Sequence, residues 1–342
     1  MNSQLADISM ALVGTGKGLL AIDESNSTCD RRFAKLGISQ TVAARRRYRE
    51  LIITTAGLGE DISGIILYDE TIRQQMDDGT SFLEVLRDAG IIAGIKVDTG
   101  AKELAGYPGE KITEGLDGLR DRLRAYFKMR ARFAKWRAVI AIDDQRPSRG
   151  CIEANAHALA RYAALCQEAG LVPVVEPEVL MKGDHTLERC REVTAECLRC
   201  VFSQLHSQRV LLEGMILKPN MVLPGFACSH QESVDEVAAA TLQCLPEIVP
   251  AAVPGIAFLS GGQSGEFASA RLNAMHVRSE SAPLRLPWAL TFSFGRAIQQ
   301  PALGIWDGQE THRTAAQQAL RRRAHCSRAA SRGEYCVEME RT

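Results

Sequence analysis

Segments of strand length alternate with helical segments along almost the whole chain, and this alternation most constrains the fold. The strand-like segments are short apolar runs, whereas the segments between them repeat their apolar residues with helical spacing. The expected strands are residues 18–23, 62–68, 91–97, 135–142, 171–178, 211–218, 255–259 and 289–294. The expected helices between them are residues 42–55, 81–89, 116–133, 154–169, 187–205 and 234–245. Eight strands that alternate with helices predict a (β/α)8 TIM barrel, a fold of the α/β class.

The length of 342 residues is compatible with two average domains or with one large barrel. No linker or break in composition divides the chain, so we expect a single domain over residues 1–342. A doubly wound open sheet is the alternative fold. Residues 306–342 differ from the rest, and we interpret them as an appended helix, over 314–330, and a mobile tail. The basic run Arg321–Arg323 is interpreted as a solvated face of this helix.

Charge and hydropathy exclude several classes of protein. Lys plus Arg equals Asp plus Glu, and this balance argues against a general nucleic-acid or membrane-surface role. No apolar stretch approaches the roughly 20 residues that cross a bilayer. Residues 1–7 lack the basic start and apolar core of a signal peptide, so a cytoplasmic protein is expected.

The ten cysteines and seven histidines give no metal-ligand pattern. Cys197 and Cys200 form a lone pair without a second pair at zinc spacing, and the histidines are scattered. Cys166, Cys190, Cys197 and Cys200 fall at helical positions among apolar residues, as small buried side chains do. We therefore expect no metal and no cofactor.

A lysine stands at the end of the sixth expected strand. The apolar run Met215–Leu217 precedes Lys218, and Pro219 follows it. Burial disfavours the ammonium form and lowers the pKa of such a lysine. A neutral amine can attack a carbonyl and form a Schiff base. The alternative is a lysine whose ammonium group extends from the strand into water.

Several charged or polar residues fall at or near the ends of other expected strands. They are Asp23, Lys96, Glu176, Glu178, Ser260 and Arg296. In a (β/α)8 barrel the carboxyl ends of the strands hold the active site, so these side chains and Lys218 should converge there. Lys135 is the exception, because it begins the fourth expected strand. A boundary error of a few residues would place it inside the barrel.

Residue types suggest roles within this group. Like-charge repulsion from Lys135 would lower the pKa of Lys218 further, and Asp23, Glu176 and Glu178 supply acid and base groups. The turn Ser260–Gly262 offers backbone N–H groups to a phosphate, and Arg296 adds a charged fork. Arg32 and Lys96 could bind a second phosphate, although the pattern around each residue by itself favours a surface charge.

Seven ordered stretches make the chain similar to the class I, or Schiff-base, fructose-bisphosphate aldolase family, from Gly16 to about Gln318. These stretches are residues 20–25, 94–98, 133–137, 175–178, 217–222, 258–264 and 288–296. The resemblance implies a lyase that reversibly cleaves fructose 1,6-bisphosphate to dihydroxyacetone phosphate and glyceraldehyde 3-phosphate in glycolysis and gluconeogenesis. It also implies a homotetramer, and no metal, since the protonated imine accepts the electrons.

The resemblance also implies roles for individual residues. Lys218 would form the imine, Glu176 would act as acid and base in its formation, and Asp23 would assist carbon–carbon cleavage. Glu178 and Lys135 would tune the lysine. The ketone-side phosphate would meet Ser260, Gly261, Gly262 and Arg296, and the aldehyde-side phosphate would meet Arg32, Ser25 and Lys96. Ser293 and Arg137 lie in the similar stretches and are further candidates for substrate binding.

The chain departs from the best-known members of this family in three places. Their longer tails end in a tyrosine that helps to protonate the enamine, whereas this sequence ends at Thr342. Tyr335 is the nearest tail tyrosine, and either it reaches the mouth of the barrel or it packs on the outer helices. Asp143–Asp144 replaces a glycine-containing turn, and Asp69 replaces a histidine. Two other functions remain open: a Schiff-base aldolase for another phosphosugar, and a barrel scaffold without turnover.

Overall fold

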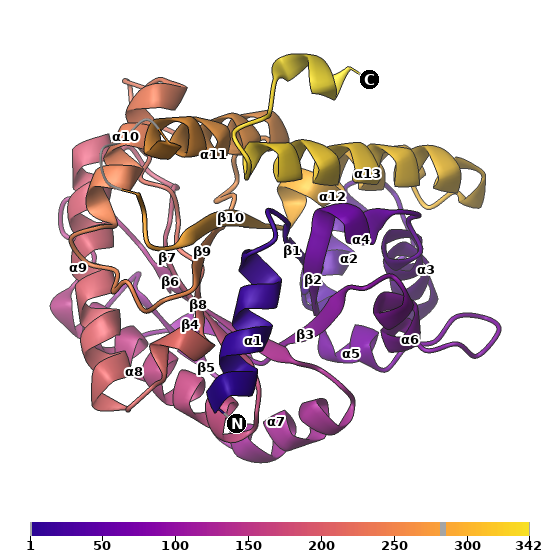
Figure 1. Cartoon of the computed structure of the whole chain (residues 1–342), viewed down its shortest axis with the longest axis horizontal. Helices are drawn as coiled ribbons and strands as arrows, with labels where there is room; N and C mark the ends of the chain where they lie inside the picture. The colour runs from indigo at the N-terminus through magenta and orange to yellow at the C-terminus, as the bar shows by residue number, and fades with distance from the viewer. Residues whose placement is uncertain (1, 281–284, 342) are drawn as a thin grey trace.

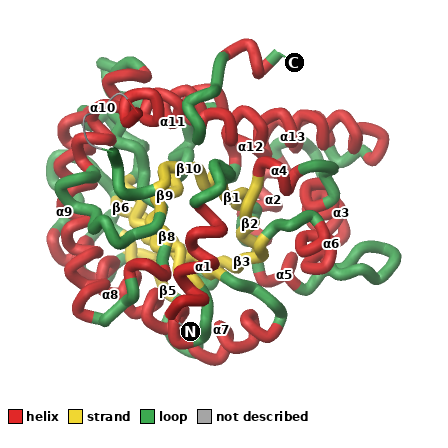
Figure 2. Tube along the Cα trace, viewed as in Figure 1, coloured by secondary structure: helices red, strands yellow, loops and turns green. Residues whose placement is uncertain are grey.

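The computed structural model describes residues 2–280 and 285–341, and its central feature is a closed barrel of eight parallel strands (Figures 1 and 2). The strands are β1 Gly18–Ala21, β2 Ile62–Leu67, β3 Ile92–Lys96, β6 Phe133–Ile140, β7 Val172–Val179, β8 Ile216–Leu217, β9 Gly255–Phe258 and β10 Ala289–Phe294. Their order around the barrel is β1-β10-β9-β8-β7-β6-β3-β2. The predicted TIM barrel is therefore confirmed, and the alternative of a doubly wound open sheet is wrong.

Helices surround the barrel, and several begin where the sequence predicts. Thr41 caps α3 and Ser81 caps α6, each accepting a hydrogen bond from a backbone N–H in the first turn. The helices are α1 Asn2–Val13, α2 Asn26–Ala34, α3 Val42–Ile53, α4 Leu58–Asp61, α5 Asp69–Ile72, α6 Phe82–Asp88, α7 Leu119–Lys128, α8 Arg149–Glu168, α9 Leu187–Ser207, α10 Val234–Cys244, α11 Gly265–Glu280, α12 Arg296–Trp306 and α13 Arg313–Ala330. A hairpin of β4 Gly100–Glu103 and β5 Lys111–Glu114 lies outside the barrel. None of the helices in the described part of the chain is both long and apolar enough to cross a membrane.

Three predicted boundaries near the site were wrong. The helix expected over 116–133 ends at Lys128, because Arg130 adopts a left-handed backbone conformation with φ of 74°. The fourth strand therefore begins at Phe133, and Lys135 lies inside it. The sixth strand is only two residues long, since Leu212–Gly214 form a 3-10 turn ahead of it.

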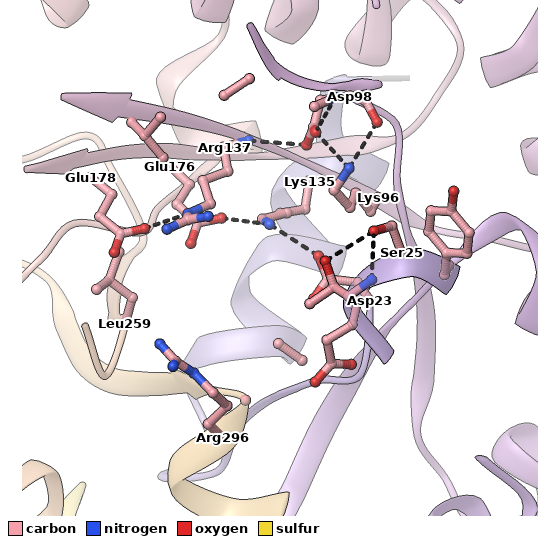
Figure 3. Close-up of a pocket in the computed structure, with 18 of the residues that line it drawn as sticks. Asp23, Ser25, Lys96, Asp98, Lys135, Arg137, Glu176, Glu178, Leu259 and Arg296 are labelled. Atoms are coloured by element: carbon pink, nitrogen blue, oxygen red, sulfur yellow. Dashed lines mark hydrogen bonds and ion pairs between the residues drawn. The ribbon is translucent and has the colours of Figure 1, made fainter. Parts of the chain in front are cut away.

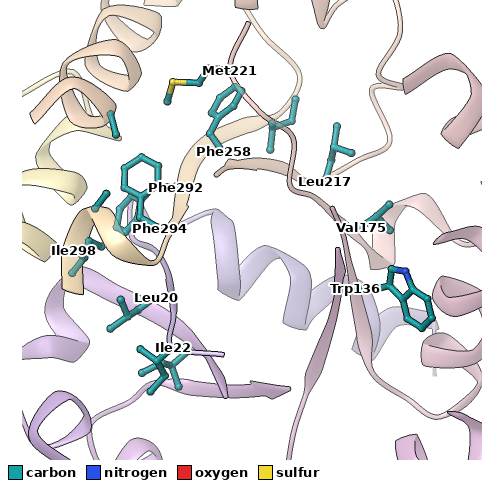
Figure 4. Close-up of a cluster of buried hydrophobic side chains, with 14 of the residues drawn as sticks. Leu20, Ile22, Trp136, Val175, Leu217, Met221, Phe258, Phe292, Phe294 and Ile298 are labelled. Atoms are coloured by element: carbon teal, nitrogen blue, oxygen red, sulfur yellow. The ribbon is translucent and has the colours of Figure 1, made fainter. Parts of the chain in front are cut away.

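The two-residue period of each strand separates the core into two regions. Leu20, Ile22, Trp136, Val175 and Leu217 point out of the barrel toward the helices (Figure 4). Their neighbours in sequence point into the barrel, and these inward residues are apolar at the amino ends of the strands and charged at the carboxyl ends.

Helix α1, which the sequence analysis did not predict, packs against the amino end of the barrel. Its residues Leu5, Leu12 and Val13 are buried against inward-facing residues of the strands, such as Leu19 and Phe133. Figure 1 shows α1, in indigo, lying across the barrel. This end of the interior is therefore sealed by apolar contacts.

The C-terminal segment packs more tightly than the sequence indicated. Arg323 is 3% exposed, so the prediction of a solvated arginine run was wrong at this residue. Arg321 forms ion pairs with Glu60 and Asp61, at 2.7 Å each. A short 3-10 helix, Val337–Glu340, follows α13.

Tyr335 belongs to this packed segment. It is 8% exposed, and its hydroxyl donates a hydrogen bond to Glu340 over 3.0 Å. The interpretation that Tyr335 packs on the outer helices therefore agrees with the structure, and the interpretation that it lies free at the barrel mouth does not. Thr342, at the end of the expected tail, lies outside the described residues.

Candidate active site

A cavity of about 590 Å³ opens at the carboxyl ends of the strands. Nearly all the residues predicted for the site line it. They are Asp23, Ser25, Arg32, Lys96, Lys135, Arg137, Glu176, Glu178, Lys218, Ser260, Gly261, Ser293 and Arg296. Gly262 is the predicted residue that does not line this cavity, although it belongs to the adjacent turn. The barrel thus brings together residues as distant in sequence as Asp23 and Arg296.

Lys218 lies deep in this cavity and is 3% exposed. It directly follows β8, and its backbone N–H donates to the carbonyl oxygen of Val175 in β7. Its Nζ lies 3.2 Å from Oε1 of Glu176. Burial lowers the pKa of Lys218 and the neighbouring Lys135 ammonium lowers it further, against the opposing effect of the Glu176 carboxylate.

Lys135 is also buried, at 4% exposure, but it has two carboxylate partners. Its Nζ lies 3.0 Å from Oδ2 of Asp23 and 3.0 Å from Oε2 of Glu176, which places it between them (Figure 3). Burial alone would lower the pKa of Lys135. The two carboxylates outweigh burial and raise the pKa above its ordinary value, so this residue is an ammonium at neutral pH.

The same contacts keep the carboxylates charged. Burial would raise the pKa of Asp23, but Lys135 and Lys218 outweigh it and hold the pKa at about 2. Lys135 and Lys218 also hold the pKa of Glu176 below its ordinary value, against burial. Two ionised carboxylates therefore flank one permanent ammonium and one amine whose charge is disfavoured.

A second pair lies on the far side of Glu176. Glu178 and Arg137 project from neighbouring strands, and the Arg137 guanidinium binds the Glu178 carboxylate (Figure 3). In the structure Glu178 is thus directed at Arg137 rather than at Lys218.

Asp98 is a site residue that the sequence analysis did not select. Its carboxylate accepts from the ammonium of Lys96 at 2.5 Å and from the backbone N–H of Arg137 at 3.3 Å. The signal was available, because a carboxylate two residues after Lys96 directly follows the third strand.

The turn after β9 has the geometry expected of an anion-binding loop. Gly261 and Gly262 have φ of 57° and 92°, a left-handed conformation that favours glycine. A Cβ added at Gly262 would lie 3.7 Å from the guanidinium of Arg296, which begins α12. Nearby, the buried hydroxyl of Ser293 has no hydrogen-bond partner among the described residues. This end of the cavity therefore offers donors to a ligand.

Ser25 and Arg32 also line the cavity, and both already have protein partners. Ser25 caps α2, and Arg32 binds the carboxylate of Glu24 and the side chain of Gln299. Glu24, which the sequence analysis also did not select, accepts from Arg49 at 2.9 Å as well. A ligand here would have to compete for Arg32 or meet its remaining N–H groups.

Two of the departures from the family have local partners outside the cavity lining. Asp69 accepts hydrogen bonds from Arg73 and from the Tyr126 hydroxyl, at 2.8 Å each. Asp143 closes its turn by accepting from the backbone N–H groups of Gln145 and Arg146. Within residues 2–280 and 285–341, no group of three or more His, Cys, Asp and Glu side chains is arranged to hold a metal ion.

Comparison with known proteins agrees with this geometry. Residues 4–342 match the family described as fructose-bisphosphate aldolase class-I. A probable fructose-bisphosphate aldolase class 1 of Xanthomonas campestris is 56% identical, over 97% of this chain and 98% of that protein. A fructose-bisphosphate aldolase of Dictyostelium discoideum is 48% identical, over 99% of this chain and 95% of that protein.

A solved structure is similar in fold as well as in sequence. It is the Plasmodium falciparum fructose-bisphosphate aldolase, in complex with TRAP and a small-molecule inhibitor. It superposes with a TM-score of 0.95 at 44% identity, covering 98% of this chain and 96% of that one. The chain belongs to the class I fructose-bisphosphate aldolase family.

Proposed function

We propose that this protein is a lyase that reversibly cleaves fructose 1,6-bisphosphate to dihydroxyacetone phosphate and glyceraldehyde 3-phosphate through an imine on Lys218. The observation that carries the proposal is a buried lysine of lowered pKa, 3.2 Å from the Glu176 carboxylate, in a cavity of about 590 Å³. Such an amine is the nucleophile that Schiff-base chemistry requires.

Imine formation follows from the position of Glu176. The neutral amine of Lys218 attacks the substrate ketone carbon and forms a carbinolamine. Proton transfer from nitrogen to oxygen gives the neutral carbinolamine. Glu176 then passes a proton taken from solvent to the carbinolamine hydroxyl, which leaves as water. The product is a protonated imine, which can accept an electron pair.

Cleavage then requires a base at the hydroxyl beyond the breaking bond. Asp23 is ionised and lies across Lys135 from Glu176, so it is the candidate for this proton transfer. The carbon–carbon bond breaks, its electrons pass to the imine to form an enamine, and the aldehyde product leaves. Protonation of the enamine and hydrolysis of the imine release dihydroxyacetone phosphate and restore Lys218.

Two groups of cavity-lining residues carry the donors and cations that two phosphates require. We assign the ketone-side phosphate to Ser260, Gly261, Gly262, Ser293 and Arg296, because the unpartnered Ser293 hydroxyl and the glycine turn supply donors there. We assign the aldehyde-side phosphate to Arg32, Ser25 and Lys96. Arg137 is the candidate for a contact with the sugar between them, and Glu178 orients it.

Borohydride trapping tests this proposal. Reduction in the presence of fructose 1,6-bisphosphate should inactivate the enzyme and attach the substrate carbon skeleton to Lys218, as mapped by mass spectrometry. Modification of Lys135 instead would overturn the assignment. Comparing cleavage of fructose 1,6-bisphosphate with that of fructose 1-phosphate separates this function from that of an aldolase for another phosphosugar, since two phosphate sites favour the bisphosphate.

Assembly and compartment are further parts of the proposal. We propose a cytoplasmic homotetramer, on the basis of membership in this family. Light scattering of the purified protein should give four times the chain mass of 37.4 kDa. The mass of a monomer would contradict the assembly and leave the chemistry untouched.

A further inference from the structure

The two segments assigned to the ketone-side phosphate meet again behind the cavity. The turn Ser260–Gly262 leads into α11, which begins at Gly265, and Arg296 is the first residue of α12. The first turns of both helices contact one side chain of the C-terminal helix, Arg323 of α13. Figure 1 shows α13 lying beside α12 and reaching α11.

The contacts of Arg323 bridge these two helices. Its Nη2 donates to the Ser269 hydroxyl of α11 at 3.0 Å, and its Nε donates to the carbonyl oxygen of Ala297, next to Arg296, at 3.4 Å. A Cβ added at Gly265 would lie 2.6 Å from that carbonyl oxygen and 2.7 Å from Nε of Arg323. The three helices therefore meet at a glycine that leaves room for the guanidinium.

The tail neutralises this buried cation. Arg323 forms an ion pair with Glu340, and Glu340 also accepts the hydrogen bond of the Tyr335 hydroxyl at 3.0 Å. The backbone N–H of Tyr335 donates to the Asn273 side chain of α11 at 2.9 Å. The tail thus returns to the same helix that carries the phosphate turn.

We propose that Arg323, Glu340 and Tyr335, which we call the tail clamp, position the ketone-side phosphate site. The inference rests on the proposed function. The planar guanidinium sets the spacing between the first turns of α11 and α12, and so between the glycine turn and the Arg296 guanidinium. A small misplacement of such donors weakens a ligand far more than it weakens the fold. Arg323 and Glu340 are positioning residues, since they lie behind the cavity and do not line it.

Discrimination between a phosphorylated and an unphosphorylated ketone tests the clamp. Borohydride trapping is measured as a function of dihydroxyacetone phosphate and of dihydroxyacetone concentration. The half-saturating concentration of dihydroxyacetone divided by that of dihydroxyacetone phosphate is a ratio that reports the phosphate site. The Arg323→Lys variant keeps the charge but loses the fork, and it should reduce this ratio about tenfold. Glu340→Gln should reduce it about threefold, because a neutral amide holds the guanidinium less firmly. KM for fructose 1,6-bisphosphate should rise in both variants by more than kcat falls.

Two matched controls separate positioning from general stability. Glu338→Gln changes an exposed carboxylate in the same 3-10 helix, and Arg328→Lys changes a cation of α13 that faces Asp61 instead. Both should keep the parent ratio. Unfolding in urea, measured for every variant, shows whether a changed ratio accompanies a comparable loss of stability.

The outcomes distinguish this inference from the proposed function. An unchanged ratio in Glu340→Gln, or equal changes in the two controls, would overturn the clamp while the aldolase chemistry stands. If the Arg323→Lys variant fails to fold, Glu340→Gln decides the question. A parent protein that is trapped by neither ketone would overturn the proposed function and the clamp together.

Discussion

The end of β8 and the middle of β6 each hold a buried lysine, and the two environments drive the lysines in opposite directions. Lys218 and Lys135 are 3% and 4% exposed, and both lie within reach of Glu176. The pKa of Lys218 is lowered, whereas that of Lys135 is raised. Burial acts alike on both, so burial does not explain the difference.

The carboxylates explain it. Lys135 has a carboxylate on each side, at 3.0 Å from Asp23 and 3.0 Å from Glu176. Among residues 2–280 and 285–341, Lys218 has only the Glu176 carboxylate within 4 Å, at 3.2 Å. The ammonium of Lys135 already occupies Glu176 and repels a charge on Lys218. One residue type thus serves as a fixed cation in one strand and as a nucleophile in another.

Removing the nucleophile, Lys218, should have the largest effect on activity of any change to the two lysines. Lys218→Ala should reduce turnover by a factor on the order of 10⁵ or more, and should abolish borohydride trapping. The fold should survive, because Glu176 keeps its ion pair with Lys135. Circular dichroism checks the fold, and trapping that persists on Lys135 would show that the two lysines are interchangeable.

Removing the fixed cation should have a smaller but still large effect. In Lys135→Met, Lys218 loses a repelling charge and gains Glu176 for itself, so its pKa should rise. The acid limb of the kcat/KM profile should then move to higher pH, and turnover at neutral pH should fall by about 10²–10⁴. Lys111→Met is the control, because Lys111 pairs with Glu103 on the hairpin. An acid limb at the parent pH would contradict this account of Lys218.

Acid stability tests the same ion pairs without catalysis. The pKa of Asp23 is about 2 in the folded protein and 3.8 at its ordinary value, so the unfolded chain binds its proton first. The ion pair between Asp23 and Lys135 therefore stabilises the fold above about pH 4, by about 2 kcal/mol. This contribution is lost as the pH falls toward about 2. Urea unfolding of the parent and of Asp23→Asn should differ in pH dependence within that window. Parallel curves for the two proteins would show that the pair adds no stability.

Chelators should have the smallest effect, namely none. The ammonium of Lys135 already lies between the Asp23 and Glu176 carboxylates, and a divalent cation would have to displace it. Activity in EDTA should equal activity in buffer, with a zinc-dependent aldolase as the positive control. If EDTA abolished activity and zinc restored it, a metal ion rather than the Lys135 ammonium would lie between the two carboxylates.

The sequence by itself determined the barrel and most of its site. Alternating apolar segments specify parallel strands covered by helices, and the carboxyl ends of such strands must share one face. Lys218, Glu176 and Asp23 could be selected on that ground, because each is a polar residue at the end of an apolar run. The hydrophobic period is local, so it can be read without any tertiary contact.

Only the tertiary structure decided which charged side chains form ion pairs with one another. Lys135 was predicted to begin a strand. The register of β6 with β3 and β7 places it inside the barrel, between Asp23 and Glu176. Glu24 was missed and Arg323 was misread for a related reason: partners such as Arg49 and Ser269 are distant from them in sequence. Ion pairs of this kind depend on distances of about 3 Å between side chains, and no pattern in a single chain encodes these distances before the barrel closes.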